Sequence, residues 1–165
     1  MLAACAGLAA CASAPTPTAS GAAARCVDPD ADAIERFAQL ASVEAVDRES
    51  GFDLDRDGVP DIAVYAPELC GTGGCVYELY VMPQASGTTC ARWVGTVEAG
   101  DLVDALEREA GAPFPSFVAT WSYGCCEMEE TRHVYDGHQY RETEARQCQR
   151  SVEDDSDTCE AWHAR

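Results

Sequence analysis

The segment GFDLDRDGVPDIAVYAP, residues 51–67, crowds four aspartates into nine positions directly before an apolar run. In the stretch D-L-D-R-D-G-V-P-D, positions 1, 3, 5 and 9 are Asp53, Asp55, Asp57 and Asp61. Alternate spacing lets these carboxylates converge while Leu54 and Arg56 point away, and position 7, Val59, can offer its backbone carbonyl. Ca²⁺ requires about 6–8 oxygen ligands of this kind. The pattern therefore predicts a calcium loop, in which Gly58 allows the sharp turn around the ion.

Electrostatics favours a cation in this loop. Two carboxylates about 5 Å apart repel by about 3 kcal/mol at an effective dielectric constant of about 20. The alternative is a solvated Asp-rich turn that binds no ion. If calcium binds, its expected role is structural, because extracellular modules often bind it with a Kd of about 10⁻⁴–10⁻³ M.

The sequence after the aspartates distinguishes two types of calcium loop. An EF-hand needs a bidentate Glu at position 12, whereas Val64 stands there, in a strand-like run. The segment instead resembles the FG-GAP or VCBS repeat of integrin-type propellers and related bacterial secreted proteins, and the match extends to Ala66-Pro67. The resemblance implies a calcium-binding β-hairpin loop with the four aspartates as ligands. A propeller needs at least four blades of about 40 residues, so one copy does not carry the adhesive function over.

The N-terminal segment resembles the end of a bacterial lipoprotein signal peptide. The lipobox pattern of Leu, two small residues and Cys occurs twice, ending at Cys5 and at Cys11. Of the ten cysteines, cleavage before Cys11 removes Cys5 and lipidates Cys11, which leaves eight to pair; cleavage before Cys5 leaves nine. We therefore expect residues 1–11 to be the signal peptide end with lipid on Cys11, and residues 12–25 to be a disordered tether.

Such a leader predicts an extracytoplasmic protein, lipid-anchored to the outer membrane or periplasmic side of the cell envelope, or secreted. A signal peptide needs a basic n-region, and no basic residue precedes Arg25. That region would then lie upstream of Met1. The alternative is an Ala-rich N-terminus that is not processed.

The other cysteines are spread irregularly along the chain, without the paired short spacings of zinc sites. Dispersed cysteines favour disulfides in an oxidising compartment. The disulfide candidates are Cys26, Cys70, Cys75, Cys90, Cys125, Cys126, Cys148 and Cys159. Their connectivity is not readable from sequence, but adjacent Cys125 and Cys126 are expected to bond to different partners, such as Cys148 and Cys159. A bond between the two would instead close a strained ring, and strained disulfides are the redox-active ones.

The composition limits the classes of partner. The chain has 29 acidic and 11 basic residues and a net charge of −18. This charge disfavours nucleic acid and anionic membrane surfaces, so membrane contact is expected through the lipid anchor only. Metal cations suit such a surface, although a solvated acidic coat is the simpler interpretation. A protein or glycan partner is not identifiable from sequence.

Residues 26–150 are expected to form one β-rich domain, followed by an acidic tail, 151–165, that Cys159 ties down. Apolar periodicity predicts a helix over residues 30–42, with Ile34, Phe37, Ala38 and Ala41 on one face. Runs rich in β-branched and aromatic residues predict strands at 61–66, 76–82, 90–98 and 116–122. Residues 101–111 suit a short helix. The predicted fold class is α+β, mainly antiparallel β-sheet with one N-terminal helix, stabilised by disulfides.

The sequence ETRHVYDGHQYRE predicts a hairpin with Asp136-Gly137 as a two-residue type I′ turn. Tyr135 would then face His138, and His133 would face Tyr140, on one side of the sheet. This cluster is either a binding surface or the half-buried aromatic face of the hairpin.

No nucleophile elbow, P-loop, zinc-protease or dinucleotide motif is present in the sequence. The leading hypothesis is a non-enzymatic cell-envelope (lipo)protein that binds or interacts through a calcium-stabilised domain. The alternatives are a small extracytoplasmic enzyme using Glu127, His133 or His138, and a thiol–disulfide redox module using Cys125 and Cys126.

Overall fold

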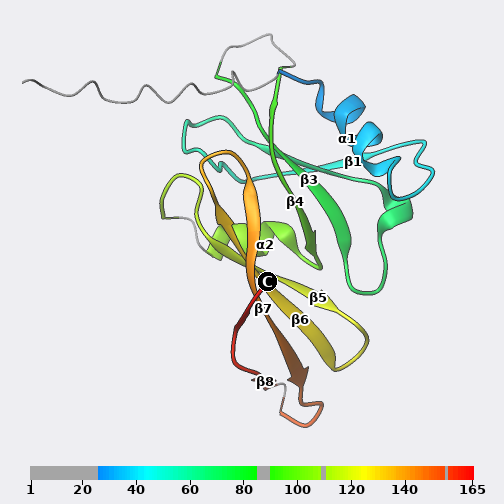
Figure 1. Cartoon of the computed structure of the whole chain (residues 1–165), viewed down its shortest axis with the longest axis vertical. Coiled ribbons are helices and arrows are strands. Elements are labelled where there is room, and N and C mark those ends of the chain that lie inside the picture. Colours follow the sequence, from blue (N-terminus) through cyan, green and yellow to red (C-terminus); the bar gives the residue numbers. More distant parts are fainter. Residues whose placement is uncertain (1–25, 85–89, 109–110, 155) are drawn as a thin grey trace, which may run out of the picture.

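The computed structural model describes residues 26–84, 90–108, 111–154 and 156–165. These residues form two antiparallel sheets, one above the other in Figure 1. The first has the order β1 (Asp47–Ser50), β2 (Ile62–Tyr65), β3 (Cys75–Val81) and β4 (Arg92–Ala99). The second has the order β5 (Phe117–Ser122), β6 (Glu127–Tyr135), β7 (Tyr140–Arg150) and β8 (Asp157–Cys159), and β9 (His163–Ala164) also pairs with β7. The predicted α+β class with mainly antiparallel sheet is confirmed.

Helix α1 (Pro29–Phe37) packs on one face of the first sheet. It begins where Asp28 caps the backbone N–H of Ala31 and Pro29 fills the first turn, which are favourable start signals. The helix is shorter than predicted, because the N–H groups of Gln39 and Leu40 turn to carbonyls three residues back. It buries Pro29, Ala33 and Phe37, so the predicted apolar face is right at Phe37 and wrong at Ala38, which is exposed.

The main core lies between the two sheets and under α2 (Leu102–Arg108). Alternation along β3 sends Tyr77, Leu79 and Val81 into this core and Tyr80 toward α1, as the two-residue period of a strand requires. The sheets approach closely where Gly95 of β4 meets Tyr140 of β7: a Cβ on Gly95 would lie 3.0 Å from the Tyr140 Cβ. Between η1 (Pro67–Leu69) and β3, residues 70–75 double back.

Four disulfides join the eight expected cysteines. They are Cys26–Cys90, Cys70–Cys75, Cys125–Cys126 and Cys148–Cys159. The expectation that Cys125 and Cys126 bond to different partners is therefore wrong. Direct pairing of the strand positions 148 and 159 satisfies those two cysteines with each other, which leaves the adjacent pair at the β5–β6 turn to bond together.

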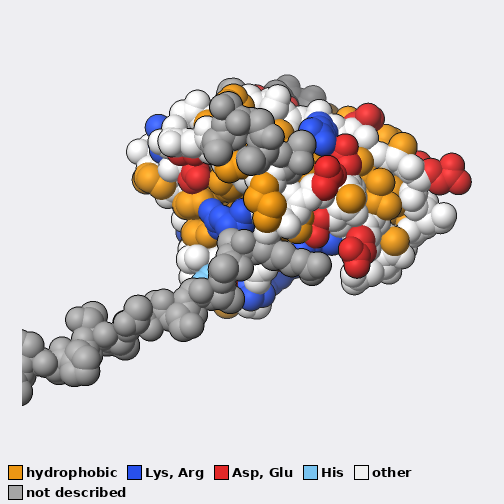
Figure 2. Space-filling model, turned by 90° about the horizontal axis from the view of Figure 1, so that it is seen from above, with side chains coloured by type: hydrophobic (Ala, Val, Ile, Leu, Met, Phe, Trp, Pro, Cys, Tyr) orange, Lys and Arg blue, Asp and Glu red, His pale blue; other side chains and the backbone are white. Residues whose placement is uncertain are grey.

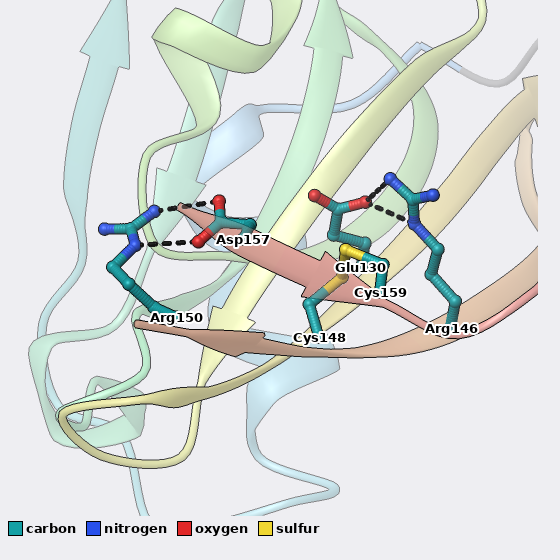
Figure 3. The surroundings of a disulfide bond; sticks show 6 residues. All are labelled: Glu130, Arg146, Cys148, Arg150, Asp157 and Cys159. Atoms are coloured by element: carbon teal, nitrogen blue, oxygen red, sulfur yellow. Dashed lines mark hydrogen bonds and ion pairs between the residues drawn. A yellow bond between two sulfur atoms is a disulfide. The ribbon is translucent and has the colours of Figure 1, made fainter. Parts of the chain in front are cut away.

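The Cys148–Cys159 disulfide ties the last segment of the chain to β7. Figure 3 shows it flanked by two ion pairs, Arg146 with Glu130 and Arg150 with Asp157. Beyond it, Glu160 N–H donates to the Gln147 carbonyl, and β9 resumes the pairing. The aromatic ring of Trp162 lies between the guanidinium groups of Arg132 and Arg146, 4.6 and 4.5 Å from its centroid.

Among the described helices, none is both long and apolar enough to cross a membrane. The expected leader and tether, including Cys5 and Cys11, lie outside the described residues. In Figure 2 acidic side chains are scattered among apolar ones over the face in view, with few arginines between them.

Candidate functional site

The aspartate-rich segment is the loop of the β1–β2 hairpin. Ser50 pairs with Ile62 at the base of the hairpin, and the N–H of Asp61 donates to the Phe52 carbonyl at 2.9 Å. Gly58 has φ +87°, a conformation that favours glycine, and Arg56 also lies in the left-handed region at φ +61°. Leu54 points into the core and is 2 % exposed. The loop thus turns sharply and presents alternate side chains to opposite sides.

Backbone hydrogen bonds wrap the loop around its first aspartates. Asp53 accepts from the N–H groups of Asp57, at 3.2 Å, and Gly58, at 2.9 Å. Asp55 also accepts from the Asp57 N–H, at 3.2 Å. Burial and the neighbouring Asp57 carboxylate raise the pKa of Asp55, since both disfavour the charged form.

Asp61 is fully buried at the base of the loop. Its Oδ2 accepts from the Leu54 N–H at 2.6 Å, and its Oδ1 accepts from the Met82 N–H at 2.8 Å. Burial raises the pKa of this carboxyl to about 6, although the two amide hydrogen bonds act in the opposite direction. Asp61 therefore already has a structural role, holding the hairpin loop to the residue that follows β3.

Three of the four predicted carboxylate ligands come together. One oxygen from each of Asp53, Asp55 and Asp61 lies within 4.8 Å of the others. The Asp57 side chain instead accepts from the Val59 N–H at 2.8 Å, and its carbonyl accepts from Gln84 at 2.8 Å. Among the described residues, no arginine forms an ion pair with these aspartates.

This donor set fits a calcium ion. Hard carboxylate oxygens at three positions match what Ca²⁺ binds, and each oxygen that accepts one amide keeps a second lone pair. Asp53, Asp55 and Asp61 would hold the ion directly. Asp57 and the carbonyl of Val59, both half-buried, would complete the coordination after a small adjustment of the loop or through water.

The hairpin loop is two residues longer than predicted and covers residues 136–139. Tyr135 pairs with Tyr140, and His133 pairs with Glu142. The Asp136 carboxylate accepts from the N–H groups of His138 and Gln139, so the turn closes between Asp136 and Gln139. The predicted pairs Tyr135–His138 and His133–Tyr140 are therefore wrong, and His138 lies exposed in the turn.

Three members of the predicted His/Tyr cluster pack together on the inner face of the sheet. The rings of His133 and Tyr140 each lie 5.1 Å from that of Phe117, and Tyr135 lies 5.5 Å from Tyr140. His133 is 3 % exposed, and burial lowers its pKa to about 4. Its Nε2 shares a hydrogen bond with Thr131. Glu127 and His138 are exposed, whereas His133 is buried. The three candidate residues of the enzyme hypothesis therefore do not form one buried catalytic cluster.

A second grouping of possible metal ligands, Glu130 with Cys148 and Cys159, is explained by the disulfide in Figure 3. Cysteines bonded to each other have no thiolate to offer a metal. The Glu130 carboxylate is occupied by Arg146 at 2.6 Å.

Sequence reasoning missed a pocket between β4 and the second sheet. It contains the carboxylates of Glu98, Glu129 and Glu142 together with Arg165. These residues are far apart in the chain and belong to no motif, so only the pairing of the strands brings them together.

Comparison of the chain with protein-family models, curated proteins and solved structures finds no match. The functional argument therefore depends on the residues of this chain.

Proposed function

We propose that this chain is an exported, non-enzymatic binding module of the bacterial cell envelope, with a calcium ion as a structural element of its β1–β2 loop. Export and a lipid anchor at Cys11 are supported by the two lipobox patterns and by the four disulfides. Disulfides persist in oxidising compartments.

One observation carries the calcium part of the proposal: oxygens of Asp53, Asp55 and Asp61 lie within 4.8 Å of one another. The loop is already folded around them by hydrogen bonds to Asp53 and Asp55. A cation would offset the mutual repulsion of three carboxylates in a partly buried setting. The FG-GAP-like pattern of the segment supports the same assignment.

The test is calcium binding by titration calorimetry on chelator-treated protein, together with thermal unfolding. Wild type is expected to bind one Ca²⁺ with a Kd in the range of about 10⁻⁴–10⁻³ M and to melt at a higher temperature when calcium is millimolar. Asp53→Asn and Asp55→Asn remove ligand charge and should each weaken binding at least about tenfold.

Asp47→Asn is the matched control, because Asp47 is an exposed aspartate on β1 outside the loop. It makes the same change of charge and should leave calcium affinity unchanged. Absence of binding by wild type would exclude the calcium site, and equal weakening in all three variants would reduce it to a general effect of surface charge.

A second candidate function is supported by the exposed Cys125–Cys126 disulfide at the β5–β6 turn. A dithiol protein could reduce this bond: its thiolate attacks one sulfur, the mixed disulfide is resolved by its second thiol, and two electrons and two protons pass to the pair. Mass spectrometry after mild reduction tests this. Selective opening of Cys125–Cys126 favours the redox module, and four equally resistant disulfides exclude it.

A further inference from the structure

A pocket of roughly 180 Å³ lies where β4 crosses the inner face of the second sheet. Three carboxylates face it: Glu98 from β4, Glu129 from β6 and Glu142 from β7. Trp121 and Tyr123, at the end of β5 and just after it, supply aromatic surface to the same pocket. The pocket is separate from the calcium loop and shares none of its aspartates.

The guanidinium of Arg165 is already seated among these carboxylates. Its Nη1 lies 2.7 Å from Glu142 Oε1, and its Nη2 forms an ion pair with Glu129 Oε1. The backbone N–H of Arg165, directly after β9, donates to the Thr143 carbonyl at 3.2 Å. The Arg165 side chain nevertheless remains 46 % exposed. Departure of this side chain alone would leave the buried Glu129 carboxylate unpaired, which is costly, so Arg165 can leave the pocket when another cation takes its place.

Glu129 is held rigidly to receive a cation. It is 8 % exposed, and its Oε2 accepts from the Tyr123 hydroxyl at 3.0 Å and from the Gln147 amide at 2.9 Å. Its Oε1 is the atom that contacts Arg165. A buried carboxylate fixed in this way presents one oxygen in a defined direction, which is the arrangement that recognises guanidinium by charge-assisted hydrogen bonds.

The charges in the pocket do not balance. Three carboxylates face one guanidinium, and burial together with the Glu98 carboxylate raises the pKa of Glu142. The neighbouring His133 is neutral at physiological pH, because burial lowers its pKa. Its Nδ1 has no hydrogen-bond partner among the described residues, which leaves an unpaired polar atom at the inner wall. The pocket therefore favours an additional or replacement cation that can donate hydrogen bonds.

We propose that this pocket binds the arginine side chain of a partner polypeptide, and that Arg165 is the intramolecular occupant that this ligand displaces. The seated Arg165 shows that a guanidinium fits the carboxylates. Aromatic faces such as those of Trp121 and Tyr123 favour a planar cation over a compact, strongly hydrated one. The inference rests on the proposed role as a binding module, but on no part of the calcium loop.

The test measures binding of arginine amide to the purified protein by titration calorimetry, with chelator present throughout. Removing the Arg165 side chain raises the fraction of molecules whose pocket is free to bind a ligand. Arg165→Ala should therefore bind arginine amide at least about tenfold more tightly than wild type. Arg141→Ala is the matched control, since Arg141 is an exposed arginine of β7 paired with Asp136 outside the pocket. It should leave the affinity unchanged.

Substitution of the carboxylates supplies the second arm. In the Arg165→Ala background, Glu129→Gln and, separately, Glu98→Gln should each weaken binding at least about tenfold, whereas Glu160→Gln, an exposed control, should not. Circular dichroism checks that Glu129→Gln folds. If that variant fails to fold, Glu98→Gln still tests the pocket, because Glu98 is exposed.

Equal affinities of wild type and Arg165→Ala would overturn the proposal. Equal binding of lysine amide would overturn the preference for guanidinium. Because chelator removes calcium from every titration, failure here says nothing against the calcium loop, and loss of calcium binding says nothing against this pocket.

Discussion

The carboxylate of Asp61 accepts a hydrogen bond from the backbone N–H of Met82, with Oδ1 and N 2.8 Å apart. Its other oxygen accepts from the N–H of Leu54. One buried side chain thus joins the β1–β2 loop to the residue after β3. This contact holds the loop in place before any ion binds.

Replacing Asp61 by Asn should destabilise the domain even without calcium. The amide of Asn keeps one acceptor and places an N–H₂ group against a backbone donor, which leaves a buried N–H unsatisfied. Such a loss costs about 1–3 kcal/mol. Urea unfolding in the presence of chelator measures it, and Asp47→Asn at an exposed position should stay within about 0.5 kcal/mol of wild type. A wild-type midpoint for Asp61→Asn would contradict this role.

His133 should lower the stability of the domain as the pH falls from about 6.5 to about 4, whereas Asp61, whose pKa burial raises to about 6, should raise it over much of the same range. Burial lowers the pKa of His133 to about 4, so in this window the unfolded chain binds a proton that the native residue does not. The free energy of unfolding then decreases with falling pH, by up to about 3 kcal/mol from this residue.

Urea unfolding at several pH values tests this contribution. His133→Phe, which keeps an aromatic ring against Phe117, should lack this loss, so its free energy of unfolding relative to wild type should rise as the pH falls from 6.5 to 4. Glu98, Glu129 and Glu142 line the same pocket in both proteins, so the difference between the two curves reports on the imidazole. His138→Phe, at the exposed turn, should keep the wild-type slope. Parallel curves for wild type and His133→Phe would refute the assignment.

The disulfides should differ in their contribution to stability according to the loop that each closes. Cys26–Cys90 spans 64 residues and Cys70–Cys75 spans 5. Loop-closure entropy gives about 4 kcal/mol for the first and about 2 kcal/mol for the second. Replacing both cysteines of each pair by Ser, followed by urea unfolding, checks the order. An equal or reversed loss would mean that local packing around the bond dominates.

Gly95→Ala should destabilise the contact between the sheets. The added methyl group would lie 3.0 Å from Cβ and 3.1 Å from N of Tyr140, at a backbone φ of +148°. We expect a loss of about 1–3 kcal/mol. Gly51→Ala is the control, because Gly51 has φ +128° with open space around it. If both variants lose the same free energy of unfolding, backbone conformation and not crowding is the cause.

Much of the fold was predictable because local sequence and burial agree. The strand over Ile62–Tyr65 is apolar and β-branched, and it is central in the first sheet. By contrast, β1 has the polar sequence DRES at a sheet edge, and β8 lies in an acidic segment. Nothing in the composition of β1 and β8 predicts a strand. Pairing with neighbouring strands holds both in place, and a disulfide also holds β8.

The candidate sites differ in the same way. The aspartate loop is contiguous, so its spacing was visible in the sequence, although the divergence of Asp57 depends on the local hydrogen bond to Val59. The hairpin loop was predicted two residues too short, because the Asp136 side chain caps a longer turn. The pocket was not predictable, since Glu129 and Arg165 meet only through tertiary pairing.

The Cys148–Cys159 disulfide joins residues that are direct register partners on β7 and β8. It therefore fixes how every later residue aligns with β7. A slip of one residue would turn each of those side chains to the opposite face of the sheet and carry Arg165 away from Glu129 and Glu142. Cys148 is paired with Met128, the neighbour of Glu129, so oxidation of this thiol pair is one of the constraints that keep the internal counterion beside the glutamates of the pocket.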